Sequence, residues 1–333
     1  MSVLVTGAAG YIGSVLSERL VESKYDVIGI DSLVTGHKSA VPEEMKLIEG
    51  DLCDLPLLDT LFTENEIDTV IHLAGSSIVS ESVKNPSLYF NNNVVNGITL
   101  LDTMRRHKVN RIIFSSSAAV YGTPAHARIK EESEKVPEHP YGESKLIFEK
   151  ILDFYRQAYG IQPISLRYFN AAGATKNRGE WHNPETHLIP NILLSIIEQK
   201  PVTVYGNDYD TPDGTCVRDY VHVADIADAH ILAMSHFNKH KHLVFNIGNT
   251  RGYSVLEVIN TCEYVTGCEI PKVYGPPRAG DPSVLVADSS SARKELGWQP
   301  EHSNLNDIIS SAWRWLETNP SGYREIFRQI LVR

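Results

Sequence analysis

Short apolar runs, rich in valine, isoleucine and leucine, alternate with helix-forming stretches along the first half of the chain. The runs occupy residues 2–6, 26–30, 46–49, 69–73 and 111–114. Helices are predicted over residues 14–21 and over a longer stretch that Asn91 opens and that continues to about His107. Strands that alternate with helices are typical of a doubly wound parallel sheet. The first half therefore predicts an α/β fold of this type.

The second half continues the alternation but is interrupted by polar segments. Strands are expected at residues 163–167, 202–205 and 243–247, and helices at 189–198, 223–235, 255–265, 289–296 and 305–316. The polar, Gly- and Asn-rich stretch 175–183 marks the entry into a second, smaller α/β lobe, built from interleaved segments. We expect residues 1–173 plus about 215–249 to form a dinucleotide-binding Rossmann domain, and about 174–214 plus 250–333 to form a substrate-binding lobe.

Composition narrows the class of partner. The 333-residue chain is 42% hydrophobic and 22% charged, as in an ordinary soluble globular enzyme, and its net charge is −10. This acidity argues against a nucleic-acid or anionic-membrane partner. The four cysteines form no Cys-x-x-Cys pair, and the spacing of His236, His240 and His242 suits no metal geometry, so a solvated histidine loop and no metal site are expected.

The start of the chain bears on its location. A strand-like Ser2–Thr6 leaves no room for a signal peptide, and no apolar run approaches membrane-spanning length. We therefore expect a cytoplasmic protein.

A glycine-rich turn follows the first strand. Gly7, Gly10 and Gly13 lie in a Gly-x-x-Gly-x-x-Gly spacing between that strand and a helix, where glycines permit a tight turn and close approach to a pyrophosphate. Asp31 ends the second strand, 18 residues beyond Gly13. A carboxylate there can accept hydrogen bonds from the adenosine ribose and repels a 2′-phosphate, which predicts NAD rather than NADP.

Other polar groups are expected at the carboxyl edge of the sheet. Asp51, after the third strand, is placed to meet the adenine amino group. His72 lies within the fourth strand and is interpreted as a core histidine. Residues 74–77 form a small-residue loop at the edge where ligands bind. For Asn92, a ligand contact and a solvated helix cap are equally favoured.

Tyr141 and Lys145 carry the expected chemistry. Residues four apart on a helix share one face, so the phenol and the ammonium can project into one site. Holding a phenolate near pH 7 costs about 4 kcal/mol, and a nearby ammonium and an oxidised nicotinamide would each supply part of it. The serine run that ends in Ser117 follows the fifth strand, so one of its hydroxyls can reach Tyr141; the alternative is a serine-rich turn.

Two arginines on separate loops, Arg218 and Arg278, are suited to clamp a diphosphate. Either one alone would more often make a surface salt bridge.

The segments Thr6–Gly13, Phe114–Gly122 and Tyr141–Lys145 together resemble the extended short-chain dehydrogenase/reductase family, in particular its nucleotide-sugar 4-epimerases, over essentially the whole chain. The resemblance implies NAD-dependent exchange of UDP-glucose and UDP-galactose through a 4-keto sugar, with Ser117, Tyr141 and Lys145 catalytic. It also implies a homodimer packed through the helices near 92–107 and 141–159.

The resemblance further implies two sets of binding residues. The cofactor set is Gly7, Gly10, Tyr11, Ile12, Gly13, Asp31, Asp51, Leu52, Leu73, Ala74, Gly75, Asn92, Tyr141, Lys145 and Phe169. The UDP-sugar set is Ser117, Asn170, His187, Leu188, Thr203, Tyr205, Arg218, Arg278, Asp281 and Leu285. Leu285 is expected beside carbon 2 of the hexose, with a plain core position as the alternative.

Two departures from the family pattern matter. Ser77 stands where these epimerases often carry a lysine, which predicts a looser grip on the cofactor. Ala118 and Ala119 replace the acidic pair with which the related dehydratases eliminate water. Other enzymes of the group, acting on uronates or pentoses or decarboxylating UDP-glucuronate, remain alternatives. A non-catalytic dinucleotide sensor is disfavoured because Ser117, Tyr141 and Lys145 are all present.

Overall fold

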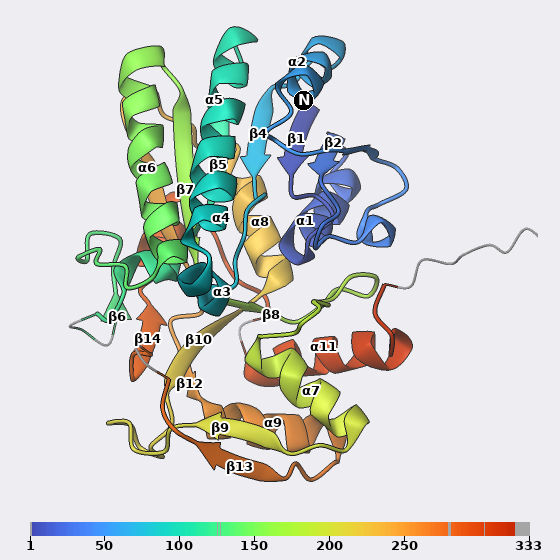
Figure 1. Ribbon diagram of the computed structural model, residues 1–333, viewed down its shortest axis with the longest axis vertical. Helices are drawn as coiled ribbons and strands as arrows, with labels where there is room; N and C mark the ends of the chain where they lie inside the picture. Colours follow the sequence, from blue (N-terminus) through green and yellow to red (C-terminus); the bar gives the residue numbers. More distant parts are fainter. Residues whose placement is uncertain (1, 125, 127, 279–280, 303, 324–333) are drawn as a thin grey trace, which may run out of the picture.

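A parallel seven-stranded sheet forms the larger part of the molecule (Figure 1). The computed structural model describes residues 2–323 except 125, 127, 279, 280 and 303. The strand order is β11-β7-β5-β4-β1-β2-β3, and every neighbouring pair is parallel. The strands are β1 (Ser2–Thr6), β2 (Asp26–Asp31), β3 (Lys46–Glu49), β4 (Thr69–His72), β5 (Arg111–Ser117), β7 (Gln162–Tyr168) and β11 (Leu243–Ile247). The predicted doubly wound sheet is confirmed.

Helices cover both faces of this sheet. One face packs on α1 (Tyr11–Glu22), α8 (Val223–Ala233) and α10 (Ser290–Glu295), and the other on α2 (Leu55–Glu64), α5 (Asn96–Arg106) and α6 (Pro140–Tyr159). Successive strand residues point to opposite faces, so Ile112 joins one core and Ile113 the other. This explains why the strands read as continuous apolar runs. Each such fully buried side chain contributes about 1.5–3 kcal/mol.

The long helix expected from Asn91 begins earlier than the sequence indicated. Asn85 caps α4 (Pro86–Phe90) by accepting a hydrogen bond from Leu88 N at 3.3 Å, with Pro86 at the first helical position. The chain then continues through a π-helical turn, η2 (Asn91–Val95), into α5. The expectation that Asn91 opens the helix is therefore wrong, because Asn85 is the residue that starts it. The short helix α3 (Val79–Lys84) precedes α4.

The carboxyl ends of the strands face a second lobe, drawn below the sheet in Figure 1. Its larger sheet has the order β12-β10-β14-β6, with β8 on β10, and β13 pairs separately with β9. Its strands are β6 (Arg128–Ile129), β8 (Asn170–Ala172), β9 (Val202–Tyr205), β10 (Val217–His222), β12 (Gly252–Ser254), β13 (Lys272–Gly275) and β14 (Val284–Ala287). Its helices are α7 (Leu188–Glu198), α9 (Val255–Thr266) and α11 (Leu305–Thr318). Among the described residues, 3-10 turns are formed by η1 (Lys38–Ala40) and η3 (Ala118–Tyr121).

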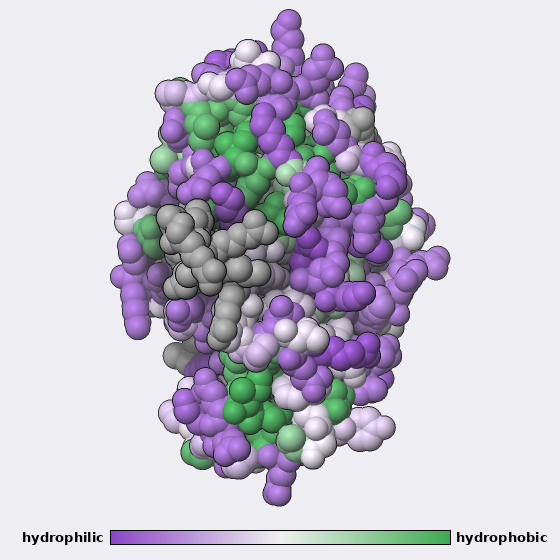
Figure 2. All heavy atoms as spheres, turned by 90° about the vertical axis from the view of Figure 1, so that its right-hand side faces the viewer, coloured by the Kyte–Doolittle hydropathy of each residue, from purple (hydrophilic) through white to green (hydrophobic). Residues whose placement is uncertain are grey.

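The chain crosses between the lobes more than once. β10 lies in the second sheet, and the chain then returns through α8 and β11 to the first. Hydrophilic side chains dominate the face in Figure 2, and apolar side chains come to the surface there in both the upper and the lower half. Within the described part of the chain, no helix has the length and apolar character needed to cross a membrane.

Candidate active site

The Gly-rich turn between β1 and α1 is built for close backbone approach. Gly7 has a φ of +71°, and a Cβ on it would lie 2.7 Å from Ala74 N. A Cβ on Gly13 would lie 2.0 Å from the Gly7 carbonyl oxygen. Gly10 caps α1 without a side-chain hydrogen bond, so the N–H groups at Tyr11 and Ile12 are free to meet an anion. The turn lies where the strand order reverses at β1, the position at which doubly wound sheets bind dinucleotides.

Asp31 is held rigidly at the end of β2. Its Oδ2 accepts a hydrogen bond from Ala9 N at 2.9 Å, and its Oδ1 accepts one from Leu33 N at 2.8 Å. Both oxygens keep a lone pair for the ribose hydroxyls of a dinucleotide. The residues present therefore fit NAD, with a fixed carboxylate where NADP would carry a phosphate.

Replacing Asp31 with alanine should weaken NAD binding and narrow the preference for NAD over NADP. The loss of a charged acceptor for two hydroxyls should lower the NAD/NADP affinity ratio by about 10- to 100-fold. Titration of both dinucleotides into both proteins measures this ratio. The control is Asp26→Ala at the exposed start of β2. An unchanged ratio in Asp31→Ala would show that this carboxylate does not contact the ribose.

Asp51 and Leu52, which are predicted to lie at the adenine end of the cofactor, follow β3. Asp51 Oδ1 accepts hydrogen bonds from Cys53 N at 2.9 Å and from Asn96 Nδ2 at 3.1 Å. The Leu52 side chain is 5% exposed and packs in the sheet core. The Tyr11 hydroxyl donates to the Gly173 carbonyl at 2.6 Å, which joins the two lobes.

The loop after β4 is held by an asparagine that the sequence did not single out. Asn93 is 2% exposed; its Oδ1 accepts from Ser76 N at 2.8 Å, and its Nδ2 donates to Ser76 O at 3.0 Å and to Ser144 Oγ at 2.9 Å. The predicted Asn92 makes a 3.0 Å hydrogen bond to Ser76 Oγ. The loop of Leu73, Ala74 and Gly75 is thereby fixed to α6. The sequence alone does not distinguish Asn93 from Asn91 and Asn92, because it does not show which of the three side chains faces α6.

Tyr141 and Lys145 lie one turn apart at the start of α6. His139 caps this helix by accepting a hydrogen bond from Gly142 N at 3.1 Å. Lys145 Nζ donates to the Ser115 carbonyl at 2.8 Å and lies 5.9 Å from the centre of the Tyr141 ring. A Cβ on Gly75 would lie 3.8 Å from the same ammonium. The predicted pair therefore sits together, between the ends of β4 and β5.

Burial shifts the pKa values of this pair. It lowers the pKa of Lys145, which is 5% exposed, to about 8. Burial also raises the pKa of Tyr141, and the Ser117 side chain acts in the opposite direction. At neutral pH the lysine is therefore charged and the tyrosine is neutral. A further positive charge beside the phenol is needed to form phenolate, and oxidised nicotinamide would supply it.

A buried ion pair holds α6 against the sheet. The Arg167 guanidinium donates to Glu149 Oε2 at 2.6 Å and Oε1 at 2.9 Å, and Ser116 Oγ donates to Oε1 at 2.6 Å. Burial opposes ionisation of Glu149, but Arg167 more than offsets it and the pKa is lowered. Glu149 and Arg167 position the helix that carries Tyr141. These two residues could not be singled out from the sequence, because they become partners only when β7 and α6 pack together.

The two predicted arginines converge. Arg218 is on β10 and forms an ion pair with Asp281, and the Arg278 guanidinium lies 4.3 Å from the centre of the Tyr205 ring. Both arginines act against the burial that raises the pKa of the Cys216 thiol. Asp281 is thus the partner of Arg218. Residues 279 and 280, in the predicted Arg278 loop, lie outside the described residues.

The other predicted substrate residues lie on several elements. Phe169, Ala118 and Leu146 are buried in one cluster against which Leu285 packs. Asn170 begins β8, and Leu188 begins α7. Thr203 and Tyr205 are exposed on β9, which among the described strands pairs only with β13. His187 instead turns its Nδ1 toward the Glu180 carboxylate.

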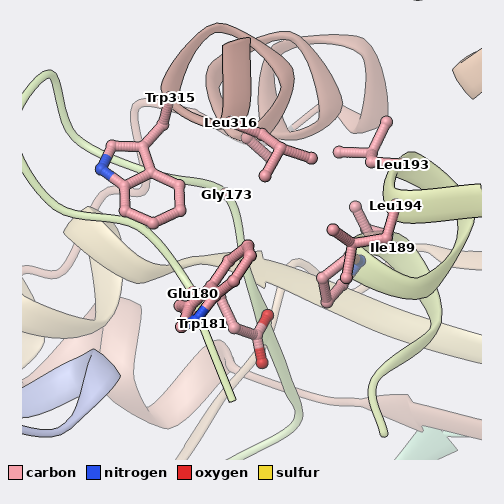
Figure 3. A pocket seen from close by; sticks show the side chains of 10 residues that line it. Gly173, Glu180, Trp181, Ile189, Leu193, Leu194, Trp315 and Leu316 are labelled. Atoms are coloured by element: carbon pink, nitrogen blue, oxygen red, sulfur yellow. The ribbon is translucent and has the colours of Figure 1, made fainter. Parts of the chain in front are cut away.

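An apolar pocket lies between α7 and α11. In Figure 3, Glu180 and Trp181 line one side of the pocket, and Trp315 and Leu316 line the opposite side. Ile189 of α7 also lines the pocket. The pocket is part of the core of the second lobe, and Glu180 is the acidic residue at its edge.

Two histidine expectations have different outcomes. His72 is buried, and its Nδ1 lies 2.8 Å from Thr6 Oγ1, so the predicted core role is confirmed. Burial lowers its pKa to about 3. His242 is not solvated as expected: its Nε2 lies 2.8 Å from Ser165 Oγ, and burial lowers its pKa to about 4. The strand β11 begins at Leu243 and draws His242 onto β7.

The fold and this site define a class. A family profile described as "NAD dependent epimerase/dehydratase family" matches residues 3–248, and the chain belongs to this family. The chain is 49% identical over 329 residues to the UDP-glucose 4-epimerase of Lactobacillus helveticus, covering 98% of this chain and 100% of that one.

Solved structures agree with this. The UDP-glucose 4-epimerase of Bifidobacterium longum, in complex with NAD+ and UDP, superposes with a TM-score of 0.92 at 41% identity, covering 97% of this chain and 100% of that one. The UDP-Glc/GlcNAc 4-epimerase of Campylobacter jejuni gives 0.83 at 37% identity, covering 95% and 99%. The resemblance predicted from the sequence motifs is confirmed.

Proposed function

We propose that Tyr141, Ser117 and Lys145 carry out the NAD-dependent 4-epimerisation of a UDP-hexose, with UDP-glucose and UDP-galactose as the main pair. The chain is thus an isomerase. The observation that carries the residue assignment is the Tyr141 phenol one helical turn from the buried Lys145 ammonium, where the Ser117 side chain acts against the burial that raises the pKa of Tyr141. This group lies beside the loop that closes the dinucleotide crevice.

Tyr141 acts as general base and then as general acid. It removes the proton of the sugar 4-hydroxyl, directly or through Ser117, and returns it after the sugar has turned. NAD, when held by the glycine-rich turn and Asp31, would supply the hydride acceptor and donor for carbon 4. Lys145 stabilises the phenolate by its charge, and the buried setting strengthens this interaction.

The substrate must be held at one end and free at the other. Arg218 and Arg278 neutralise the diphosphate, Asn170 and Leu188 contact it, and the edge of β9 at Thr203 and Tyr205 pairs with the uracil. The flat 4-keto sugar then swings about its link to the anchored diphosphate. No net oxidation occurs, so no second redox substrate is needed.

A substrate panel tests the assignment against its nearest rivals. UDP-glucose and UDP-galactose should interconvert faster than any uronate or pentose pair, and UDP-glucuronate should release no carbon dioxide. Ala118 and Ala119 provide no acid or base for a further elimination step. If a uronate or pentose pair turned over faster, that pair and not the hexose pair would be the main substrate.

Leu285 sets the room available at carbon 2 of the hexose. It shares a face of β14 with Ala287 and packs on the cluster that contains Phe169 and Ala118. A leucine is shorter than an aromatic ring and has no hydroxyl with which to fix a water. We therefore expect slower but measurable action on UDP-N-acetylglucosamine.

Leu285→Tyr should depress the N-acetylhexosamine activity selectively, by about 10-fold or more relative to the hexose activity, because a filled pocket excludes the acetamido group. Rates on both substrate pairs decide this. Leu285→Met, which conserves volume, is the control and should leave the ratio unchanged. If both activities fall by the same factor in Leu285→Tyr, the residue is a core position and the substrate range is set elsewhere.

The chain forms a homodimer through α5 and α6. Apolar side chains remain exposed along these helices and η2: Phe154 is 67% exposed, Tyr159 53% and Val95 51%. Such a surface favours self-association with two-fold symmetry. Light scattering of the purified chain tests this, and a monomer mass would exclude it.

In this proposal the larger lobe, residues 1–173 plus about 215–249, holds NAD, and the smaller lobe, about 174–214 plus 250–333, holds most of the nucleotide sugar. The strands β8 and β10 of the first set pair in the sheet of the second lobe, so they bring Asn170 and Arg218 to the nucleotide-sugar site. The protein acts in the cytoplasm, in keeping with the free state of all four cysteines, Cys53, Cys216, Cys262 and Cys268.

A further inference from the structure

Four metal-ligating side chains converge in the segment between β8 and α7. Glu180, His182, Glu185 and His187 each offer one ligand atom, and these atoms all lie within 4.8 Å of one another. His182 Nδ1 is 3.4 Å from Glu180 Oε1 and 3.5 Å from Glu185 Oε2. His187 Nδ1 is 3.9 Å from Glu185 Oε1 and contacts Glu180 Oε1. No metal site was predicted from the sequence, where the cysteines and the histidines of residues 236–242 lack metal-ligand spacing.

We propose that these four residues bind one divalent transition-metal ion, with zinc preferred. Tetrahedral zinc with bonds of about 2.0–2.2 Å holds its ligand atoms about 3.4 Å apart. The His182–Glu180 and His182–Glu185 separations match this value and are longer than the 2.7–3.2 Å typical of N–H···O hydrogen bonds.

The surroundings of His182 fit such an ion. Its Nδ1 atom is buried and makes no hydrogen bond, and the nearest carboxylate oxygens, on Glu180 and Glu185, lie 3.4 and 3.5 Å away. A buried polar atom that makes no hydrogen bond is costly. A metal ion at the centre of the cluster would satisfy this nitrogen together with the two carboxylates, whose side chains are each 6% exposed.

The ligand types select the class of ion. Two neutral imidazoles and two carboxylates neutralise a divalent cation, and the nitrogen donors favour zinc and its neighbours over magnesium or calcium. Four protein ligands fill a tetrahedral shell, as in structural zinc sites. The ion is therefore assigned to holding this segment in place and not to proton or hydride transfer.

The segment held in this way joins the lobes and leads into the substrate site. Trp181 O lies 3.0 Å from His37 Nε2, and Arg178 forms an ion pair with Glu18 of α1. Leu188, the first residue of α7, follows His187 directly. An ion that holds His187 would therefore also hold the start of α7. Any consequence for binding of the UDP-sugar rests on the function proposed above.

Metal analysis of the full-length chain, purified without a polyhistidine tag, tests the site. After zinc loading and dialysis, the wild type should hold about one zinc per chain, and added Co²⁺ should give the visible absorption of a tetrahedral site. His182→Ala and Glu185→Gln should each lose most of the zinc and the cobalt band. The matched control is His240→Ala, at an exposed histidine of the predicted loop, which should keep both.

A second set of readouts separates this proposal from the proposed function. In His182→Ala the KM for UDP-galactose should rise by about 3- to 10-fold with a smaller change in kcat. His182→Gln and the circular dichroism of each variant guard against a loss due to misfolding. Full zinc binding without epimerase activity would leave the metal site standing and remove the function.

Two results would overturn the site. One is a wild type that retains less than about a tenth of an equivalent of zinc and gives no cobalt band, which would make the cluster an ion-pair network of protonated histidines and carboxylates. The other is zinc retained in His182→Ala and Glu185→Gln but lost in His240→Ala, which would move the metal to residues 236–242.

Discussion

Replacing Tyr141 with phenylalanine is expected to lower kcat on UDP-galactose by about 10²- to 10⁴-fold, the usual contribution of a positioned acid/base. The ring remains, so the packing of α6 against β5 should survive. Binding of NAD and of UDP should change little, because only the hydroxyl that exchanges the proton is lost.

Steady-state rates and separate binding titrations of NAD and UDP distinguish this result from general damage. Tyr155→Phe is the matched control on the same helix, since it removes a single 3.1 Å hydrogen bond to Asp102. Its turnover should stay near that of the wild type. A Tyr141→Phe enzyme with near-normal turnover would show that another group moves the proton.

Replacing Lys145 with methionine is expected to have two opposite effects. Turnover should fall by about 10²-fold or more, because the charge that favours phenolate is lost. Stability of the cofactor-free protein at pH 7 should rise, because a buried ammonium is removed from a site that lowers its pKa to about 8. A methionine fills similar volume without that desolvation.

The size and pH window of the stability gain follow from linkage. Between pH 8 and the ordinary lysine value of 10.5, the unfolded chain holds a proton that the folded chain does not, so wild-type stability rises with pH across this window. Below pH 8 the full cost, about 3 kcal/mol, is present. Lys145→Met should remove both the cost and this part of the slope.

Urea unfolding at pH 7 and at pH 10 measures both effects. Lys150→Met, at an exposed position one turn further along α6, is the control and should show neither. A Lys145→Met protein that is less stable than the wild type at pH 7 would contradict this prediction. It would show that interactions beyond the 2.8 Å hydrogen bond to Ser115 offset the cost of burying the ammonium.

The sequence was sufficient to predict the sheet and the proximity of Tyr141 and Lys145, because both depend on local patterns. Strands such as β5, in which Ile112, Ile113 and Phe114 are buried, contain a short apolar run that can be recognised in the sequence. Tyr141 and Lys145 are brought together by helical periodicity alone. The role of Gly13 could be predicted because only glycine leaves room for its backbone to lie against the backbone of Gly7.

Residues that act across elements could not be predicted in this way. Asn93 differs from Asn91 and Asn92 only in facing Ser144 of α6, and a π-helical turn sets that direction. The Glu149–Arg167 pair joins α6 to β7. In each case the sequence shows ordinary polar residues, and their role exists only after two distant elements have packed.

The most direct test of the account is the fate of a label at carbon 4. UDP-galactose deuterated at that carbon, incubated with the purified chain and NAD but no reductant, should yield UDP-glucose that keeps its deuterium, because the hydride leaves and returns within one site. Mass spectrometry and NMR of the product measure both conversion and label. Failure to form UDP-glucose, or formation of UDP-glucose whose deuterium has exchanged with water, would contradict epimerisation by internal hydride transfer.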